Sequence, residues 1–119
     1  MSCSTPTFDL CVKRGDSFIV TITYQDASKQ PIDLTGYTAR LQIRAKVSST
    51  EFALELTEAS GLTLGGSAGT IDIALTPAQT ESDLSELKAG VYDLELTSPA
   101  GIVTTIIGGS VTLAAQVTR

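Results

Sequence analysis

One stretch of the sequence indicates the class of fold most clearly: Tyr37-Thr38-Ala39-Arg40-Leu41-Gln42-Ile43-Arg44-Ala45-Lys46. Apolar and polar residues alternate along it, so its side chains divide between two faces with the period of a β-strand. One face carries Tyr37, Ala39, Leu41, Ile43 and Ala45, and the other carries Thr38, Arg40, Gln42, Arg44 and Lys46. This pattern is typical of an antiparallel strand with one side in the core. We therefore expect a half-buried strand whose wet outer face is basic.

The same alternation recurs along most of the chain and predicts further strands. We expect them at residues 8–12, 17–24, 51–57, 70–75 and 90–97, and in a last strand from 102 to 113 that is broken at Gly108-Gly109. In the third of these ranges Phe52, Leu54 and Leu56 should point inward. A glycine pair inside a strand suggests a bulge or a crossing point.

One short helix is predicted between residues 75 and 90. Thr76-Pro77-Ala78-Gln79 has the form of a capping box, with threonine as the N-cap, proline at the first helical position and glutamine at the third. Acidic residues follow early in the segment, where they complement the helix dipole. The helix should end by Leu87, before Gly90, which makes it no more than a connector.

The segment Leu87-Lys88-Ala89-Gly90-Val91-Tyr92 narrows the choice of fold. Leu-x-x-Gly-x-Tyr is the form of a tyrosine corner, in which the tyrosine hydroxyl bonds the backbone across one end of a sandwich. Leu87, Gly90 and Tyr92 are therefore predicted structural residues, although a tyrosine can also simply begin a strand. Together with many short strands, the segment predicts an all-β, Ig-like antiparallel β-sandwich with one short connecting helix, in a single domain over residues 1–119.

The composition limits the chemistry that this chain can perform. It has 119 residues, a net charge of −5 and no histidine, which removes Ser-His-Asp and Cys-His systems and His-ligated metal sites. The acidic residues are scattered, and there is no asparagine to complete a calcium site. We predict no enzyme, no cofactor and no metal. The acidic balance argues against nucleic acid as a partner, and no apolar run has the length of a membrane span.

Two cysteines, Cys3 and Cys11, lie near the start of the chain. On one extended strand they would be about 26 Å apart, too far for a disulfide. A bridge would require the chain to reverse between them, for which Pro6 offers a bend. We expect two reduced thiols. Residues 1–10 lack the basic start and apolar stretch of a signal peptide, which predicts synthesis in the cytoplasm without export.

A family resemblance extends over residues 8–119. It is carried by the joint order of Phe8-Asp9-Leu10, Arg14-Gly15-Asp16-Ser17-Phe18, Pro31-Ile32-Asp33-Leu34-Thr35-Gly36-Tyr37-Thr38-Ala39-Arg40, Ala68-Gly69-Thr70-Ile71, Leu75-Thr76-Pro77-Ala78-Gln79-Thr80, Gly90-Val91-Tyr92-Asp93-Leu94-Glu95-Leu96, Gly109-Ser110-Val111-Thr112-Leu113 and Val117-Thr118-Arg119. In this order the chain resembles small virion-associated proteins of tailed bacteriophages. Its N-terminal part also resembles the first domain of phage baseplate proteins that hold receptor-binding proteins.

The resemblance implies an Ig-like sandwich that serves as an assembly module in the tail, baseplate, neck or capsid surface. It transfers no catalytic residue. We therefore expect a structural virion protein, made in the host cytoplasm and present in several copies, that binds other virion proteins and copies of itself. The alternative is a ligand- or carbohydrate-binding sandwich, which would expose Tyr24 or Tyr37 over a groove.

Three candidate contact surfaces follow from the sequence. They are an N-terminal arm (residues 1–7), a C-terminal tail (residues 114–119) and the basic stripe of the first strand discussed. The candidate interface residues are Met1, Cys3, Thr7, Arg40, Arg44, Lys46, Gln116 and Arg119. Termini can order on docking or simply fray, and a charged stripe can equally be a solvated face.

Overall fold

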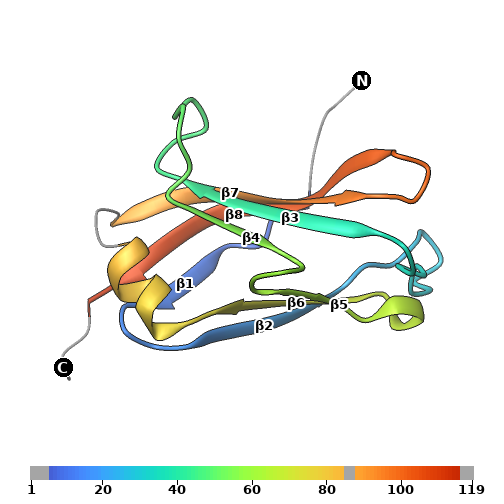
Figure 1. Cartoon of the computed structure of the whole chain (residues 1–119), viewed down its shortest axis with the longest axis horizontal. Helices are drawn as coiled ribbons and strands as arrows, with labels where there is room; N and C mark the ends of the chain where they lie inside the picture. The colour runs from blue at the N-terminus through green and yellow to red at the C-terminus, as the bar shows by residue number, and fades with distance from the viewer. Residues whose placement is uncertain (1–5, 85–87, 116–119) are drawn as a thin grey trace.

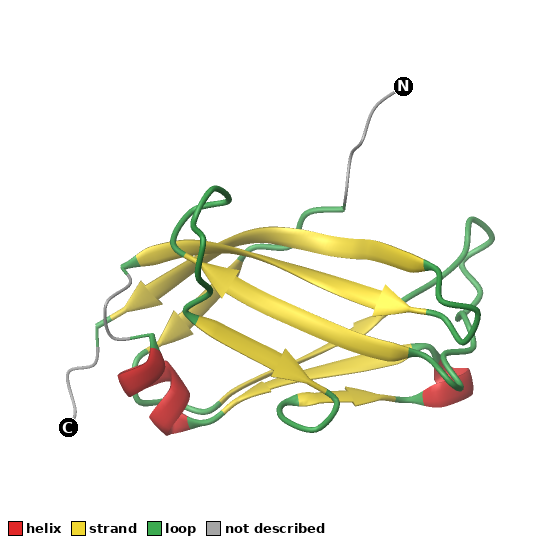
Figure 2. Ribbon diagram, turned by 45° about the horizontal axis from the view of Figure 1, so that its top comes forward, coloured by secondary structure: helices red, strands yellow, loops and turns green. Residues whose placement is uncertain are grey.

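The architecture of the chain is two stacked β-sheets, seen in a computed structural model that describes residues 6–84 and 88–115 (Figures 1 and 2). One sheet has the order β1 (Leu10–Lys13), β8 (Val103–Ala114), β7 (Ala89–Thr97), β3 (Thr38–Arg44) and β4 (Leu54–Thr57). The other has the order β2 (Phe18–Thr23), β6 (Thr70–Leu75) and β5 (Leu62–Leu64). Two short helical segments, η1 (Gly66–Ala68) and η2 (Gln79–Asp83), lie at opposite ends of the sandwich.

The strand order identifies the sandwich as Ig-like. β2, β5 and β6 occupy the places of strands B, D and E, while β3, β4, β7 and β8 occupy those of C, C′, F and G. All pairs are antiparallel except β1 with β8, which run parallel. The prediction of an Ig-like antiparallel sandwich with a connecting helix is confirmed.

The core lies between the sheets and is made of aliphatic side chains, with one tyrosine. Alternate residues of β3, β6 and β7 are buried, as the sequence pattern predicts: Ala39, Leu41 and Ile43, then Ile71, Ile73 and Leu75, then Tyr92, Leu94 and Leu96. Leu54 and Leu56 of β4 are also buried, whereas Phe52 is 47% exposed. The inward prediction for Phe52 was wrong because β4 pairs with β3 only from Leu54, opposite Ile43. Phe52 lies in the loop 45–53, beyond the end of the sheet.

The glycine pair in β8 does not break the strand. β8 runs continuously from Val103 to Ala114, and its register on β7 shifts between Leu94 and Glu95, which leaves Ile106 as the extra, bulged residue. At the pair itself the N-terminal segment runs parallel beside β8, with Thr7 at Gly108 and Leu10 at Val111. A Cβ atom on Gly109 would lie 2.8 Å from the carbonyl oxygen of Phe8, so only glycine lets the N-terminal segment pass this closely.

The connecting helix is present and begins as predicted. Thr76 N–H donates to Gln79 Oε1 at 2.8 Å, and Gln79 N–H donates to Thr76 Oγ1 at 3.2 Å, which is the reciprocal pair of a capping box. The segment opens with an α-type bond from Thr80 N–H to Thr76 O at 3.1 Å and widens into a π-type turn, closed by the bond from Leu84 N–H to Gln79 O at 3.1 Å. Leu87, where we expected the helix to end, lies outside the described residues.

The connecting helix is fixed to the turn between β1 and β2 by the Thr80 hydroxyl, which is fully buried. Thr80 Oγ1 accepts the Gly15 N–H at 3.0 Å, and its proton lies between the carbonyl oxygens of Asp16 (2.9 Å) and Pro77 (3.1 Å). Arg14 Nη1 adds a second tie by donating to Leu84 O at 3.0 Å. One hydroxyl therefore joins segments that lie 64 residues apart.

Thr80→Val should lower the free energy of unfolding by about 1–2 kcal/mol, because it keeps the volume but leaves the Gly15 N–H without its acceptor. Thr80→Ser retains the hydroxyl and should lose less. Urea unfolding of the three proteins measures the difference. Equal losses for valine and serine would show that the methyl group, and not the hydrogen bonds, stabilises this contact.

Candidate interaction surfaces

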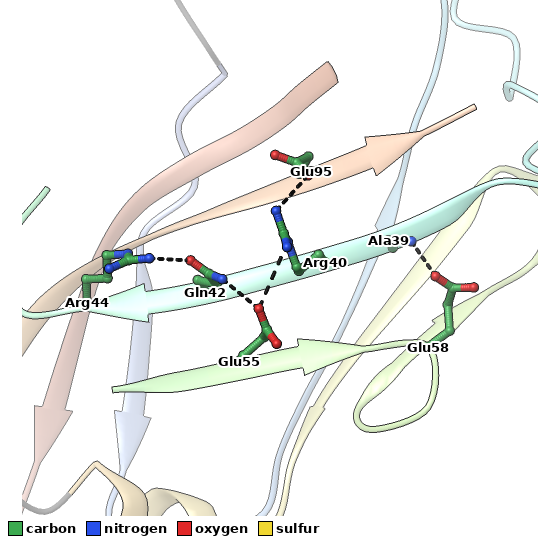
Figure 3. A network of polar contacts seen from close by, with 7 residues as sticks. All are labelled: Ala39, Arg40, Gln42, Arg44, Glu55, Glu58 and Glu95. Atoms are coloured by element: carbon green, nitrogen blue, oxygen red, sulfur yellow. Dashed lines mark hydrogen bonds and ion pairs between the residues drawn. The ribbon is translucent and has the colours of Figure 1, made fainter. Parts of the chain in front are cut away.

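A polar network covers the outer face of the five-stranded sheet (Figure 3). The guanidinium of Arg40 on β3 lies 3.4 Å from Glu95 Oε1 on β7 and 4.0 Å from Glu55 Oε2 on β4. Arg40 thus bridges both neighbouring strands, opposite Glu95 and Thr57 in the register. More than half of its side chain remains exposed, so these pairs contribute little to stability.

The network continues along β3 toward the loop 45–53. Gln42 Nε2 donates to Glu55 Oε2 at 2.6 Å, and Arg44 Nη2 donates to Gln42 Oε1 at 2.7 Å (Figure 3). Arg44 Nη1 also donates to the carbonyl of Ser49 at 2.9 Å, inside that loop. The Arg44 guanidinium is therefore held in one orientation by two uncharged acceptors.

The expectation of a basic outer face is corrected by these contacts. Arg40 and Arg44 lie on β3, but Glu55 of β4 and Asp93 and Glu95 of β7 lie beside them on the same face. The face is mixed in charge and its cations are already engaged. Lys46 lies past the end of β3, where its backbone N–H donates to Ser49 Oγ at 3.1 Å.

The N-terminal segment is anchored where it runs beside Gly108 and Gly109 of β8. Phe8 N–H donates to Gly108 O at 2.9 Å, and Gly108 N–H donates to Pro6 O at 3.1 Å. These two bonds make an isolated parallel β-bridge between Thr7 and Gly108. Asp9 Oδ1 accepts the Ser110 N–H at 3.0 Å. The segment then enters β1, whose Leu10 and Val12 are buried in the core. Thr7, predicted to belong to a docking arm, is thus part of the sandwich edge.

Tyr92 completes this anchor. Its hydroxyl donates to the carbonyl of Phe8, 84 residues away in the sequence. The predicted hydrogen bond to backbone is present, but its acceptor is the N-terminal segment. Burial, with a smaller contribution from the Asp9 carboxylate, raises the pKa of Tyr92 to about 12. Gly90, the second predicted structural residue of this motif, is buried at the start of β7.

The remaining predicted interface residues lie outside the described residues: Met1, Cys3, Gln116 and Arg119. The predicted tail starts too early, because Ala114 belongs to β8 and pairs with Lys13. Cys11 is a free, exposed thiol on the outer side of β1.

Two pairs of exposed apolar side chains mark opposite ends of the sandwich, which is 43 Å long. Val47 (86% exposed) and Phe52 (47%) lie in the loop 45–53, which follows β3. Ile102 (66%) and Val103 (57%) lie at the turn between β7 and β8. β3 and β7 are antiparallel, so the two pairs are at opposite ends, as the green and orange loops of Figure 1 show. Sequence reasoning missed both pairs, whose signal is apolar residues within turn-like segments.

Among the shallow depressions on the surface of the described residues, two involve residues discussed above. One, of about 280 Å³, is lined by Gln42, Arg44, Val47, Val91, Asp93 and Glu95 on the outer face of the five-stranded sheet. Another, of about 400 Å³, is lined by Tyr37, Leu34, Glu58, Leu62 and Leu64. Tyr37 is half-buried and packs against the core, as does Tyr24. Among the described residues, no cluster of three His, Cys, Asp or Glu side chains could hold a metal ion, and no helix is long and apolar enough to cross a membrane.

No protein-family model and no curated protein matches the chain. Among solved structures, the chain is similar to the extracellular domain of the voltage-gated sodium channel beta4 subunit, whose parallel homodimers are described as explaining its role in cell–cell adhesion. The likeness covers 98% of each chain at 12% sequence identity and a TM-score of 0.49. A likeness this distant says nothing about partners or function, and the assignment of the fold rests on the strand order.

Proposed function

We propose that this chain is a structural protein of a phage virion, an assembly module of the tail, baseplate, neck or capsid surface that acts by binding other proteins. The sequence resemblance suggests the virion. The observation that supports a bridging role is the pair of exposed apolar side chains at each end of the sandwich. Isolated exposed apolar residues are ordinary, but two within one loop or turn can supply the apolar centre of a docking contact.

The two ends suit an adaptor that joins one component to the next. Burying a fully exposed apolar side chain against a partner contributes about 1.5–3 kcal/mol, and these side chains contribute less in proportion to what is already buried, Phe52 being 47% exposed and Ile102 66%. Many copies arranged by the symmetry of the particle would add their contributions. The mixed-charge face between the ends would then remain in water.

The test uses particles assembled without the chain, to which purified protein is added back. Val47→Ser/Phe52→Ser and Ile102→Ser/Val103→Ser each remove one apolar end. If the chain is an adaptor, one double variant should bind the particles at least tenfold more weakly. The other should bind normally but fail to recruit the next component. Binding is measured as copies per particle after a density gradient.

Thr63→Ala is the control, because Thr63 is an exposed residue on the outer face of the three-stranded sheet, away from both ends. It should leave both steps unchanged. If both double variants bind and recruit like the wild-type protein, the apolar ends are not the contacts. If the wild-type protein does not bind the particles at all, the virion proposal itself is wrong.

A ligand-binding module is the second candidate, favoured by one observation. Tyr37 lines the depression of about 400 Å³, together with the carboxylate-bearing Glu58. An aromatic ring beside a hydrogen-bonding group is a common element of a small-molecule site. Specific binding on a glycan array that is lost in Tyr37→Ala would establish this function instead.

A further inference from the structure

Edge strands expose unpaired N–H and C=O groups that can pair with another chain, and most edges of this sandwich are guarded. β5 has three residues. β1 has four and ends in Lys13. β4 has four and carries the charged Glu55, and past its end Glu58 accepts the Ala39 N–H of β3. The first half of β8, which β1 does not reach, carries the bulge at Ile106.

β2 lacks every one of these guards. It has six residues, Phe18-Ile19-Val20-Thr21-Ile22-Thr23, with no charge, no proline and no break in its register with β6. Five of the six are β-branched, which favours pairing as a strand. Ile19 is 72% exposed, and the inward Phe18, Val20 and Ile22 are only partly buried. β2 is therefore the longest unprotected end strand of the two sheets.

The backbone groups that face this open edge can be assigned. Tyr24 N–H donates to Gly69 O on the β6 side at 2.8 Å, and bonded pairs alternate along an antiparallel ladder. The N–H and C=O groups of Ile19, Thr21 and Thr23 consequently point away from β6. The hydrogen bonds on the other side of β6 agree with this assignment. Ala74 N–H donates to Gly61 O, so the backbone N–H and C=O groups of the even-numbered residues of β6 point toward β5. Within residues 6–84 and 88–115, no backbone hydrogen bond outside the sheet involves β2.

We propose that a second copy of this chain binds this edge, β2 against β2, and extends the three-stranded sheet into one of six strands. This inference rests on the proposed assembly function and names a surface and a partner for it. An antiparallel pair of identical strands is its own complement under a two-fold axis. With the axis beside Thr21, Ile19 of one copy meets Thr23 of the other, and about six main-chain hydrogen bonds form.

Charge does not oppose the pairing of two copies along β2 itself. Two molecules of net charge −5 repel each other, but β2 itself is uncharged. The acid that contacts β2 directly is Asp72 on β6, whose Oδ1 accepts a hydrogen bond from Thr21 Oγ1 at 2.7 Å, while Asp16 and Asp26 lie beyond the two ends of the strand. In the paired sheet the two Asp72 side chains would be three strand spacings apart, about 14 Å. That exceeds the screening length of about 8 Å at physiological salt.

The pairing should be weak in dilute solution. One strand edge buries less than the roughly 800 Å² per partner of a stable interface. The β2–β2 pair would form where many copies are held close together on a particle. The backbone makes most of the contact, so a charge placed at Thr21 should disrupt it, while the fold loses only the exposed hydrogen bond from Thr21 to Asp72.

The experiment combines sedimentation velocity with three variants of the full chain. Thr21→Lys and Thr21→Glu place like charges opposite each other at the two-fold axis, so each should associate at least tenfold more weakly than the wild-type protein. An equal mixture of the two should associate again, because lysine then faces glutamate. Thr63→Lys is the matched control: Thr63 and Thr21 both flank Asp72, but Thr63 lies on the guarded strand β5.

Amide hydrogen exchange tests which backbone groups of β2 pair between the two copies. At high concentration the amides of Ile19, Thr21 and Thr23 should become protected, while those of Val20 and Ile22 are protected at every concentration. Association that persists equally in both Thr21 variants would place the contact elsewhere, overturning this inference but not the assembly function. A wild-type protein that stays monomeric at all concentrations would also overturn it, and binding to particles would then test the function separately.

Discussion

Gly109→Val should release the N-terminal segment from β8 and lower the free energy of unfolding by about 3 kcal/mol or more. A Cβ atom on Gly109 would lie 2.8 Å from Phe8 O and 3.0 Å from Phe8 C, which are backbone atoms that cannot rotate away. The segment must therefore move, and β1 with it. Leu10 and Val12 would then leave the core, each at a cost of about 1.5–3 kcal/mol.

Gly108→Ala is the matched control for this clash. Its Cβ would approach Tyr92 O to 3.1 Å, a contact that a shift of a few tenths of an ångström relieves. It should cost about 1 kcal/mol. Urea unfolding gives both free energies, and amide exchange in β1 reports whether the segment is released. Equal effects for the two variants, or a Gly109→Val protein with protected β1 amides, would contradict this account of the close contact between Gly109 and Phe8.

Tyr92→Phe should make the protein less sensitive to alkaline pH. The pKa of Tyr92 is about 12 in the folded protein against about 10 when exposed, so the folded state keeps a proton that the unfolded state loses. The stability due to this shift is fully present below pH 10 and is lost as the pH rises from 10 to 12. The loss amounts to about 2–3 kcal/mol, because each unit of pKa shift corresponds to about 1.4 kcal/mol.

The measurement is the free energy of unfolding of both proteins at pH 7 and at pH 11.5. At pH 7 the variant should be less stable by about 1 kcal/mol, because the hydrogen bond to Phe8 O is lost. At pH 11.5 the difference should shrink or reverse. Parallel losses in the two proteins would mean that Tyr92 does not control the alkaline limit.

The strands and the core could be predicted because they depend on local pattern. Leu41, Ile43, Ile71 and Leu94 alternate with polar residues, and that alternation only has to match one buried face. Phe52 follows the same pattern but was misplaced, because the sequence does not reveal where β4 begins to pair with β3. The capping box at Thr76 was predicted correctly, since both of its bonds lie within four residues.

The surface could not be predicted in the same way, because its contacts join distant segments. Arg40 on its own strand suggests a basic stripe, but Glu55 and Glu95 reach it from β4 and β7. Tyr92 was recognised as structural, yet its partner Phe8 is 84 residues away. In each case the strand order decides the neighbours, and strand order is not contained in the pattern of a single strand.

The amount of this chain in purified phage particles tests the central claim most directly. A structural virion protein should be present in a fixed ratio to the major capsid protein, measured by quantitative mass spectrometry. That ratio should remain constant across independent preparations after a density gradient. Absence of the chain from particles, or a trace amount that varies between preparations and washes away, would contradict the proposal that it is built into the virion.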